Sequence, residues 1–275
     1  NITALSSSIP FLNIYIFNVA QSIIAIFLAG DFLKRDKKLD TAEVTHVRPM
    51  SNADYITGKT WGIIRVFVGL NIMALLIAAF INIFASDSPF NLFAYIFYLL
   101  TLSVPSLVFV LGLSFLVMSI VKNQAITLIL LLGYIGVTLV YLGDTAHGAF
   151  DFFSVTLPNI FSEITGHPDL RVYLIQRFTF LFLGIGLLAF TVGLMKRLPQ
   201  HPGKKIMLHV MGLFFFLAGV GCCMDYIMHF RGKEQLRHDY LMTYKKYTGQ
   251  DNLDIIATDL TFRQDGNRME VNSII

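Results

Sequence analysis

Residues 53–60 contain the pattern that comes closest to a catalytic or nucleotide-binding motif. They fit a relaxed phosphate-loop expression that ends in Gly-Lys-Thr, with alanine in place of the first glycine. A phosphate loop holds phosphates with backbone N–H groups and a lysine, and it needs a strand before it and a soluble helix after it. Here an Arg-Pro-Met-Ser turn precedes the pattern and a long apolar run follows it. We therefore expect no nucleotide binding at this stretch.

The seven histidines and two cysteines are the other residues that could hold a metal or act as nucleophiles. The sequence has no HExxH motif, and no two histidines stand at ligand spacing with a carboxylate in support. Cys222 and Cys223 are adjacent, and we interpret them as small packing residues. We expect no metal site, no cofactor and no catalytic residue in this chain.

Long runs without charge are the main feature of the chain. Its residues are 55% apolar and 14% charged, against about 25% charged in an average soluble domain. A bilayer core needs about 20 helical residues, and backbone groups in lipid must be satisfied within helices. The sequence therefore predicts an all-α polytopic membrane protein with six spans, at residues 9–30, 61–84, 90–121, 124–143, 172–195 and 206–229.

The third span is too long to cross a membrane without tilting, and Pro105 lies in its middle. A proline removes one backbone hydrogen bond and kinks a helix. Two interpretations are open: a tilted, kinked helix, or a broken helix that lines a pathway.

Polar residues and glycines within the spans are interpreted mainly as packing elements. Arg177 is expected to snorkel toward the end of the fifth span. Amides that could bond between helices are Asn71, Asn82 and Gln124. Glycines that would permit close helix approach are Gly133, Gly136, Gly184 and Gly186.

Asp225 is the acidic residue that falls inside a predicted span, and His229 follows one turn later on the same face. An ionisable residue within a membrane is a functional candidate by default. This intramembrane polar pair has two interpretations, a structural pair near the membrane surface or a proton-linked role.

The distribution of basic residues predicts the topology. Eleven Lys and Arg residues fall in three loops: 31–60, 122–123 and 196–205. The alternate loops carry only Arg171: 85–89 and 144–171. Because Lys and Arg beside spans mark the cytoplasmic side, we expect the first three loops inside and both chain ends outside, with residues 1–8 as an external stub. The five basic residues in 230–246 oppose this assignment unless they belong to a translocated domain.

The loop 31–60 is the longest expected cytoplasmic connection. Ser51 followed by Asp54 predicts a capping box, with a helix from Asn52 into the second span. Upstream, Asp40 could cap a short helix over residues 41–47. The tip between these helices is placed to insert into a cytoplasmic partner; an ordinary interfacial loop is the alternative. Lys59, Trp61 and Arg65 are interpreted as interfacial anchors of the second span.

Residues 48–62, RPMSNADYITGKTWG, resemble the cytoplasmic loop of ABC-2 type transporter permeases. In that family a Pro-x-Ser turn leads into a short helix, and a Gly-Lys pair opens the next span. The order of the later spans also fits, and residues 144–171 resemble the family's re-entrant or external helices. The resemblance covers about residues 9–195. It assigns contact with an ATPase to Val47, Arg48, Pro49, Met50, Ser51, Asn52 and Tyr55.

The resemblance implies the permease subunit of an ATP-driven exporter in the bacterial inner membrane. It implies that a separate ATPase subunit binds ATP and Mg on the cytoplasmic side, and that a second permease copy completes the pathway. Lipid surrounds the spans, and no nucleic acid is expected. The chain itself would not be an enzyme.

The sequence departs from the family at both ends. Residues 9–30 match the family's second span, and 206–229 is an additional span. Residues 233–248 predict an external amphipathic helix with a stripe of Leu236, Tyr240, Tyr244 and Tyr247. Apolar and polar residues alternate before and after Asp265-Gly266, and Asp-Gly is a turn signal, so this stretch predicts a hairpin.

We expect residues 230–275 to begin a β-rich extracytoplasmic domain, similar to permeases fused to a zinc-aminopeptidase-like domain. The alternative function is a membrane anchor for such a domain, without transport. A secondary transporter is less well supported, because the spans lack mid-membrane charges and internal repeats.

Overall fold

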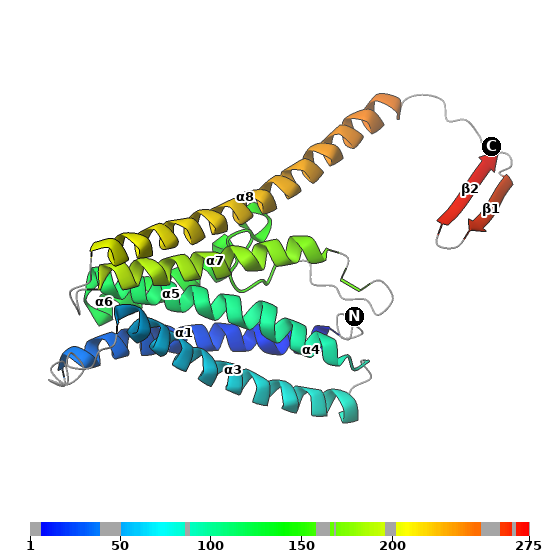
Figure 1. The fold of residues 1–275 in the computed structure, drawn as a ribbon. Helices are drawn as coiled ribbons and strands as arrows, with labels where there is room; N and C mark the ends of the chain where they lie inside the picture. Colours follow the sequence, from blue (N-terminus) through cyan, green and yellow to red (C-terminus); the bar gives the residue numbers. More distant parts are fainter. Residues whose placement is uncertain are drawn as a thin grey trace. The chain divides into compact units, whose positions relative to one another are not determined.

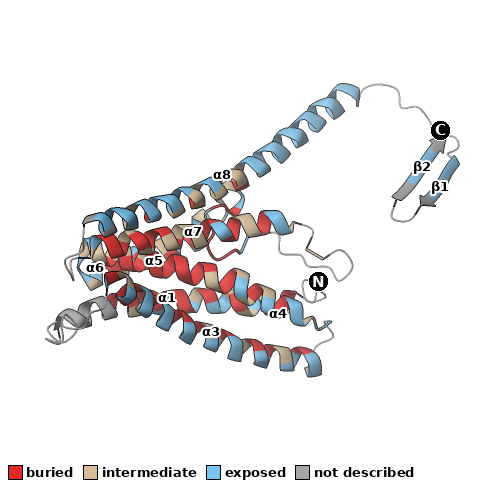
Figure 2. Ribbon diagram, viewed as in Figure 1, coloured by how far each residue is buried: buried red, intermediate tan, exposed pale blue. Residues whose placement is uncertain are grey.

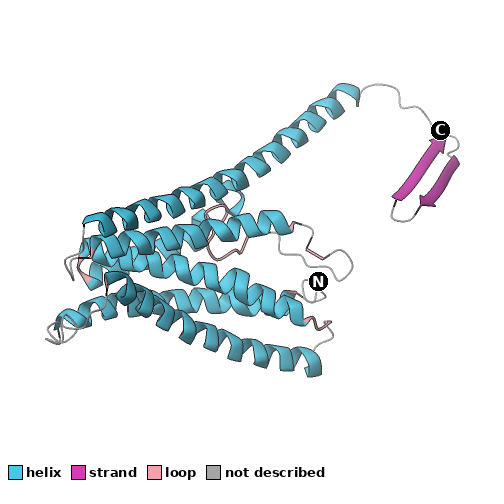
Figure 3. Ribbon diagram, in the orientation of Figure 1, coloured by secondary structure: helices cyan, strands magenta, loops and turns pink. Residues whose placement is uncertain are grey.

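Six helices in the computed structural model are long and apolar enough to cross a membrane (Figure 1). The structure describes residues 7–38, 51–85, 89–157, 166–167, 169–195, 202–248, 259–265 and 268–274. The chain is mostly helical and divides into two compact units, Asn1–Phe230 and Arg231–Ile275 (Figure 3). The expected class of all-α polytopic membrane protein agrees with this architecture.

The helical elements follow one another along the chain. They are α1 (Ser8–Lys38), α3 (Asn52–Ala85), α4 (Leu92–Tyr98), η2 (Leu99–Ser103), α5 (Val104–Val121), α6 (Gln124–Val137), η3 (Thr138–Leu142), η4 (Thr145–Gly148), α7 (Leu170–Leu194) and α8 (Pro202–Tyr247). Each of the six predicted spans falls on one of these helices or on a continuous series of them. The main differences are that α1 continues to Lys38, into the loop predicted over 31–60, that α3 begins nine residues before its predicted span, and that α8 continues beyond its span.

The third span is continuous, with a π-helical turn in front of Pro105. α4 passes into the π-helix η2, and α5 begins at Val104 with the proline in its first turn. A proline has no N–H to donate and its ring crowds the carbonyl four residues earlier. The wider π turn lies at that position, and π turns inside α-helices often mark functional sites.

α5 forms the centre of the first unit. It packs against α1, α3, α6 and most extensively α7, and buried residues concentrate on it and on the facing side of α7 (Figure 2). The outer surfaces of α3 and of η3, which continues α6, carry exposed apolar side chains, such as Phe84 at 73% and Val140 at 83%. Surfaces this apolar suit a lipid environment.

Two glycines allow the close packing of α5 and α7. A Cβ at Gly184 would lie 2.7 Å from the backbone N of Phe109, and one at Gly112 would lie 2.5 Å from the carbonyl oxygen of Gly184. The predicted close approach at Gly184 is therefore confirmed, as it is at Gly186, which meets the backbone of α8. The prediction is wrong for Gly133 and Gly136 within the described chain, because nothing there lies within 4 Å of an added Cβ.

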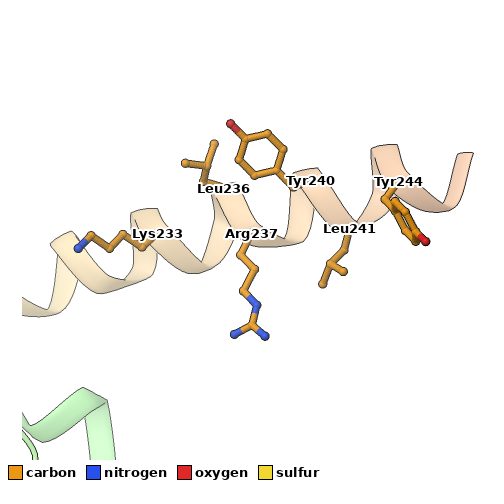
Figure 4. Close-up of a pocket in the computed structure, with 6 residues that line it drawn as sticks. All are labelled: Lys233, Leu236, Arg237, Tyr240, Leu241 and Tyr244. Carbon is orange, nitrogen blue, oxygen red and sulfur yellow. The ribbon is translucent and has the colours of Figure 1, made fainter. Parts of the chain in front are cut away.

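The second unit contains the end of α8 and a two-stranded sheet. The predicted break between a span and a separate amphipathic helix is wrong, because α8 is one helix from Pro202 to Tyr247. No proline interrupts it, and a single glycine such as Gly232 is tolerated in a helix. Figure 4 shows a shallow hollow on this exposed part of α8, lined by Lys233, Leu236, Arg237, Tyr240, Leu241 and Tyr244.

The predicted hairpin is confirmed as β1 (Asp259–Asp265) paired antiparallel with β2 (Arg268–Ile274). Phe262 lies opposite Val271, so two apolar residues form a cross-strand pair. A lone two-stranded hairpin is marginally stable in water. The larger β-rich domain remains a prediction.

Candidate functional site

The start of α3 is fixed by a capping box, as the sequence predicts. The backbone N–H of Ser51 donates to Asp54 Oδ2 at 3.0 Å, and the backbone N–H of Asp54 donates to Ser51 Oγ at 3.1 Å. These reciprocal bonds satisfy two N–H groups that a helix start leaves without partners. The helix therefore begins with a fixed first turn, which contains Ser51, Asn52 and Tyr55 of the predicted ATPase-contacting residues.

Ser51→Ala is expected to destabilise this helix start by about 1 kcal/mol, because the side-chain acceptor for the Asp54 N–H is lost. Amide hydrogen exchange at residues 52–55 measures the effect directly. Thr57→Ala is the matched control, since the Thr57 hydroxyl bonds back only to the Ala53 and Asp54 carbonyls of its own helix. Equal exchange rates in the two variants would contradict the role of the cap.

The first turns of α3 are joined to the end of α7. Asn52 is buried, and its Nδ2 donates to the carbonyl oxygen of Met195 at 3.1 Å. Tyr55 and Ile56 form a small apolar cluster with Val192 of α7. A displacement of the residues that precede Ser51 would therefore act on α3 and α7 together.

Tyr55 packs within the chain. Its exposed fraction is 8%, so most of its aromatic surface is already covered and little remains for a partner. Its burial argues against direct contact with an ATPase, which stays a prediction. Contact of Ser51 and Asn52 with an ATPase also stays a prediction. The remaining expected contact residues, Val47, Arg48, Pro49 and Met50, lie outside the described residues.

The stretch that fits the relaxed phosphate loop is helical throughout, because α3 contains residues 53–60. Its backbone N–H groups lie in helical geometry and cannot form a cradle for phosphate. Lys59 Nζ lies 4.2 Å from the centre of the Tyr55 ring, and Arg65 Cζ lies 5.1 Å from that of the Trp61 ring. Both are i, i+4 cation–π pairs, and their role as interfacial anchors stays a prediction.

The segment 143–157, at the opposite end of the bundle from Ser51, folds back among the helices. Phe152 and Phe153 are fully buried in the main core cluster, and Phe152 stacks on Tyr134 of α6 with ring centres 5.7 Å apart. The Asp151 carboxylate accepts bonds from the backbone N–H groups of Phe153, Val155 and Thr156. The carboxylate thus holds the backbone that turns back out of the bundle.

This segment carries an unusual concentration of left-handed backbone. Ala146, His147 and Ser154 have φ values of 49°, 58° and 67°. Non-glycine residues in this region cost about 1–3 kcal/mol each and cluster at ligand clamps and switch regions. The strain supports a functional role for the segment.

Arg177 of α7 holds the carbonyl groups of the folded-back segment. Its side chain is 2% exposed, Nη1 donates to the Phe152 carbonyl at 3.1 Å, and Nη2 donates to the Asp151 carbonyl at 3.0 Å. Gln176 accepts further bonds from the guanidinium and donates to the Gly148 and Asp151 carbonyls. The expectation that Arg177 snorkels is therefore wrong: its charge points into the bundle.

A residue of α5 and one of α8 complete the anchoring of the segment. Ser106 Oγ donates to the Phe152 carbonyl at 2.6 Å, and Tyr226 OH donates to the His147 carbonyl at 2.7 Å. The segment is thus bound by side chains of three helices.

Asp225, which directly precedes Tyr226 in α8, forms an ion pair with Arg171. The distance between the carboxylate oxygen and Nη2 is 3.7 Å, and both side chains are largely exposed. The His229 ring packs edge-on against the Phe230 ring. Pairing of Asp225 with His229 and any proton-linked role stay predictions.

A second buried polar cluster lies between α1, α3 and η2. Gln21 Nε2 donates to Asn18 Oδ1 and, at 3.1 Å, to Ser103 Oγ. Asn71 Nδ2 donates to Gln21 Oε1 at 2.9 Å. The predicted interhelical bonding of Asn71 is confirmed, as is that of Asn82, which donates to Tyr95 OH at 3.2 Å.

Sequence reasoning missed Asn18, Gln21 and Ser103. Two amides at i and i+3 within an otherwise apolar helix were the available signal, because their side chains share one face. The predicted placement of Arg177 failed for a different reason, since its partners are backbone carbonyls, which leave no mark in the sequence.

The described residues contain no group of three or more His, Cys, Asp or Glu side chains that could hold a metal ion. His167 contacts the rings of Phe97 and Tyr173 with centres 6.1 and 5.1 Å away. Burial lowers its pKa because the charged imidazolium loses hydration, and Asp169 opposes this effect.

Comparisons with protein-family models, with curated proteins and with solved structures find no match for this chain.

Proposed function

We propose that this chain is the membrane permease subunit of an ATP-driven exporter of the ABC-2 type. A separate ATPase would bind the loop 31–60 on the cytoplasmic side of a bacterial inner membrane and supply ATP and Mg. A second permease copy would complete the pathway. The six apolar helices and the resemblance of residues 48–62 support this proposal.

The observation that carries the proposal is the rigid junction at the start of α3. An exporter of this kind must transfer motion from an ATPase to its spans. The capping box fixes the first turn of α3, and the bond from Asn52 to Met195 joins that turn to α7. Force applied to residues 47–50 would reach both helices without being lost in a flexible linker.

The folded-back segment 143–157 supports the same proposal from the other end of the bundle. Arg177, Gln176 and Ser106 hold its backbone carbonyls, while its own residues are strained. Such a segment suits an external gate that closes a pathway between transport cycles. Motion of α7 at one end would change the contacts of Arg177 at the other.

The second candidate function is a membrane anchor for an extracytoplasmic domain. One observation favours it: α8 continues without interruption into the second unit, which also contains the β1–β2 hairpin. The anchor hypothesis requires no ATPase.

The double variant Arg48→Ala with Met50→Ala tests the proposal. Interface hot spots cost at least about 2 kcal/mol on truncation, so recovery of the ATPase with the tagged permease should fall at least about tenfold. Tyr55 is left unchanged because it packs inside the chain. Lys205→Ala, in the first turn of α8 and expected on the same side, is the control and should retain the partner. Undiminished ATPase recovery with the double variant would refute the docking role of this loop.

A further inference from the structure

The buried cluster of Asn18, Gln21, Asn71 and Ser103 lies near the middle of three apolar helices. All four side chains are at most 3% exposed, and the cluster contains no charged group. It joins α1 and α3 to the π turn η2, directly before Pro105. Uncharged polar groups in this position must satisfy one another or bind another polar molecule.

The orientation of the amides follows from one backbone contact. The Asn71 atom 2.9 Å from the Phe67 carbonyl must be Nδ2, because a carbonyl oxygen can only accept. Since Asn71 Nδ2 also faces Gln21, the Gln21 atom opposite it must be Oε1. Gln21 Nε2 then donates to Ser103 and to Asn18, whose facing atom is Oδ1.

This orientation leaves one donor and one acceptor without partners. Among the described residues, Asn18 Nδ2 and Asn71 Oδ1 are fully buried and make no hydrogen bond. Flipping either amide would not help, because it would place like groups against Gln21 or against the Phe67 carbonyl. A buried donor or acceptor that makes no hydrogen bond costs free energy. In proteins, a buried water molecule commonly supplies the missing partner.

We propose that ordered water occupies this cluster, accepting a hydrogen bond from Asn18 Nδ2 and donating one to Asn71 Oδ1. The chemistry of the two unpartnered atoms selects water over a cation. A cation needs several free oxygen atoms, whereas the oxygens of Asn18, Gln21 and Ser103 already accept bonds and a free N–H group remains.

The water site gives the bundle a hydrated point away from both membrane surfaces. It lies where α1, α3 and η2 meet. When these helices shift relative to one another, water can form hydrogen bonds in place of those that the side chains lose. This inference does not depend on export, since a membrane anchor with the same bundle would hold the same water.

The test uses the purified full chain in lipid nanodiscs. A density map that resolves water should show density for water within hydrogen-bonding distance of Asn18 Nδ2 and of Asn71 Oδ1. Hydroxyl-radical footprinting by pulsed X-rays provides a second measurement, because radicals form from bound water. Phe67, beside the cluster, should be oxidised several-fold faster than Phe115, although both are buried.

Asn18→Leu keeps the branched shape of the side chain but removes the free donor, together with the oxygen that accepts from Gln21. It should abolish the density at position 18 and reduce Phe67 oxidation to the level of Phe115. Ser114→Ala is the matched control, because Ser114 is buried and its hydroxyl bonds only to the Val110 carbonyl of its own helix. It should leave Phe67 oxidation unchanged. If the map of the unmodified chain has no peak at the cluster and Phe67 reacts no faster than Phe115, the water site is refuted, whether or not Asn18→Leu folds.

Discussion

Arg177→Ala is expected to lower the free energy of unfolding of the bundle by about 3–5 kcal/mol. The variant removes hydrogen bonds from a charged donor to the carbonyls of Asp151 and Phe152, each worth about 1.5–3 kcal/mol. It also leaves a cavity where a large, fully buried side chain was. Segment 143–157 should then leave the bundle more readily.

Arg171→Ala is the matched control on the same helix. The Arg171 side chain is 84% exposed and its ion pair with Asp225 is in contact with solvent, so its loss should cost less than about 1 kcal/mol. Thermal unfolding in detergent measures the difference between the two variants. An equal shift in both would show that the buried guanidinium does not hold the segment.

A cysteine at Ser154 reports on the segment itself. Ser154 is fully buried, so Ser154→Cys, in a chain whose native cysteines are replaced, should react slowly with maleimide. Adding Arg177→Met, which fills volume but donates no hydrogen bond, should increase the reaction rate. If the rate is unchanged, Arg177 contributes volume only and the proposed gate loses its anchor.

Gly184→Ala is the second variant with a large expected effect. Its methyl group would lie 2.7 Å from the backbone N of Phe109 and from the carbonyl group of Val108. Backbone atoms cannot move aside as a flexible side chain does, so α5 and α7 must separate. Overpacking of this kind costs about 1–3 kcal/mol.

Gly136→Ala provides the control for Gly184→Ala. Nothing lies within 4 Å of an added Cβ at Gly136, and alanine is the better helix former by about 1 kcal/mol. The control should leave the unfolding temperature unchanged or slightly raised, while Gly184→Ala lowers it. Loss of stability in both variants would indicate that Gly136 meets a neighbour, such as a second copy of the chain.

The spans could be predicted because apolar length is a property of a single segment. Neither Ser51 nor Asp54 needs a distant partner to form a capping box, and this prediction was confirmed. The hairpin around Asp265 was also predictable, because turn residues and alternation act locally. Local signals failed where α1 and α8 continue, since a charged segment can extend a helix beyond its apolar part.

The parts that could not be predicted depend on tertiary contacts. Gly184 and Gly136 look alike in sequence, but only Gly184 faces a neighbouring helix within the described chain. Arg177 is buried because segment 143–157 folds back and offers carbonyls. The amide cluster requires Gln21, Asn71 and Ser103 to meet from three elements.

Purification of the tagged full-length protein from its native membrane tests the central claim most directly. The export hypothesis predicts that an ATP-binding-cassette ATPase is recovered in stoichiometric amount and that its ATP hydrolysis in nanodiscs depends on the permease. Arg48→Ala with Met50→Ala should remove both properties while the spans remain folded. Recovery of the protein without any ATPase, together with labelling of a cysteine at position 40 by an impermeant reagent outside intact cells, would contradict the permease function.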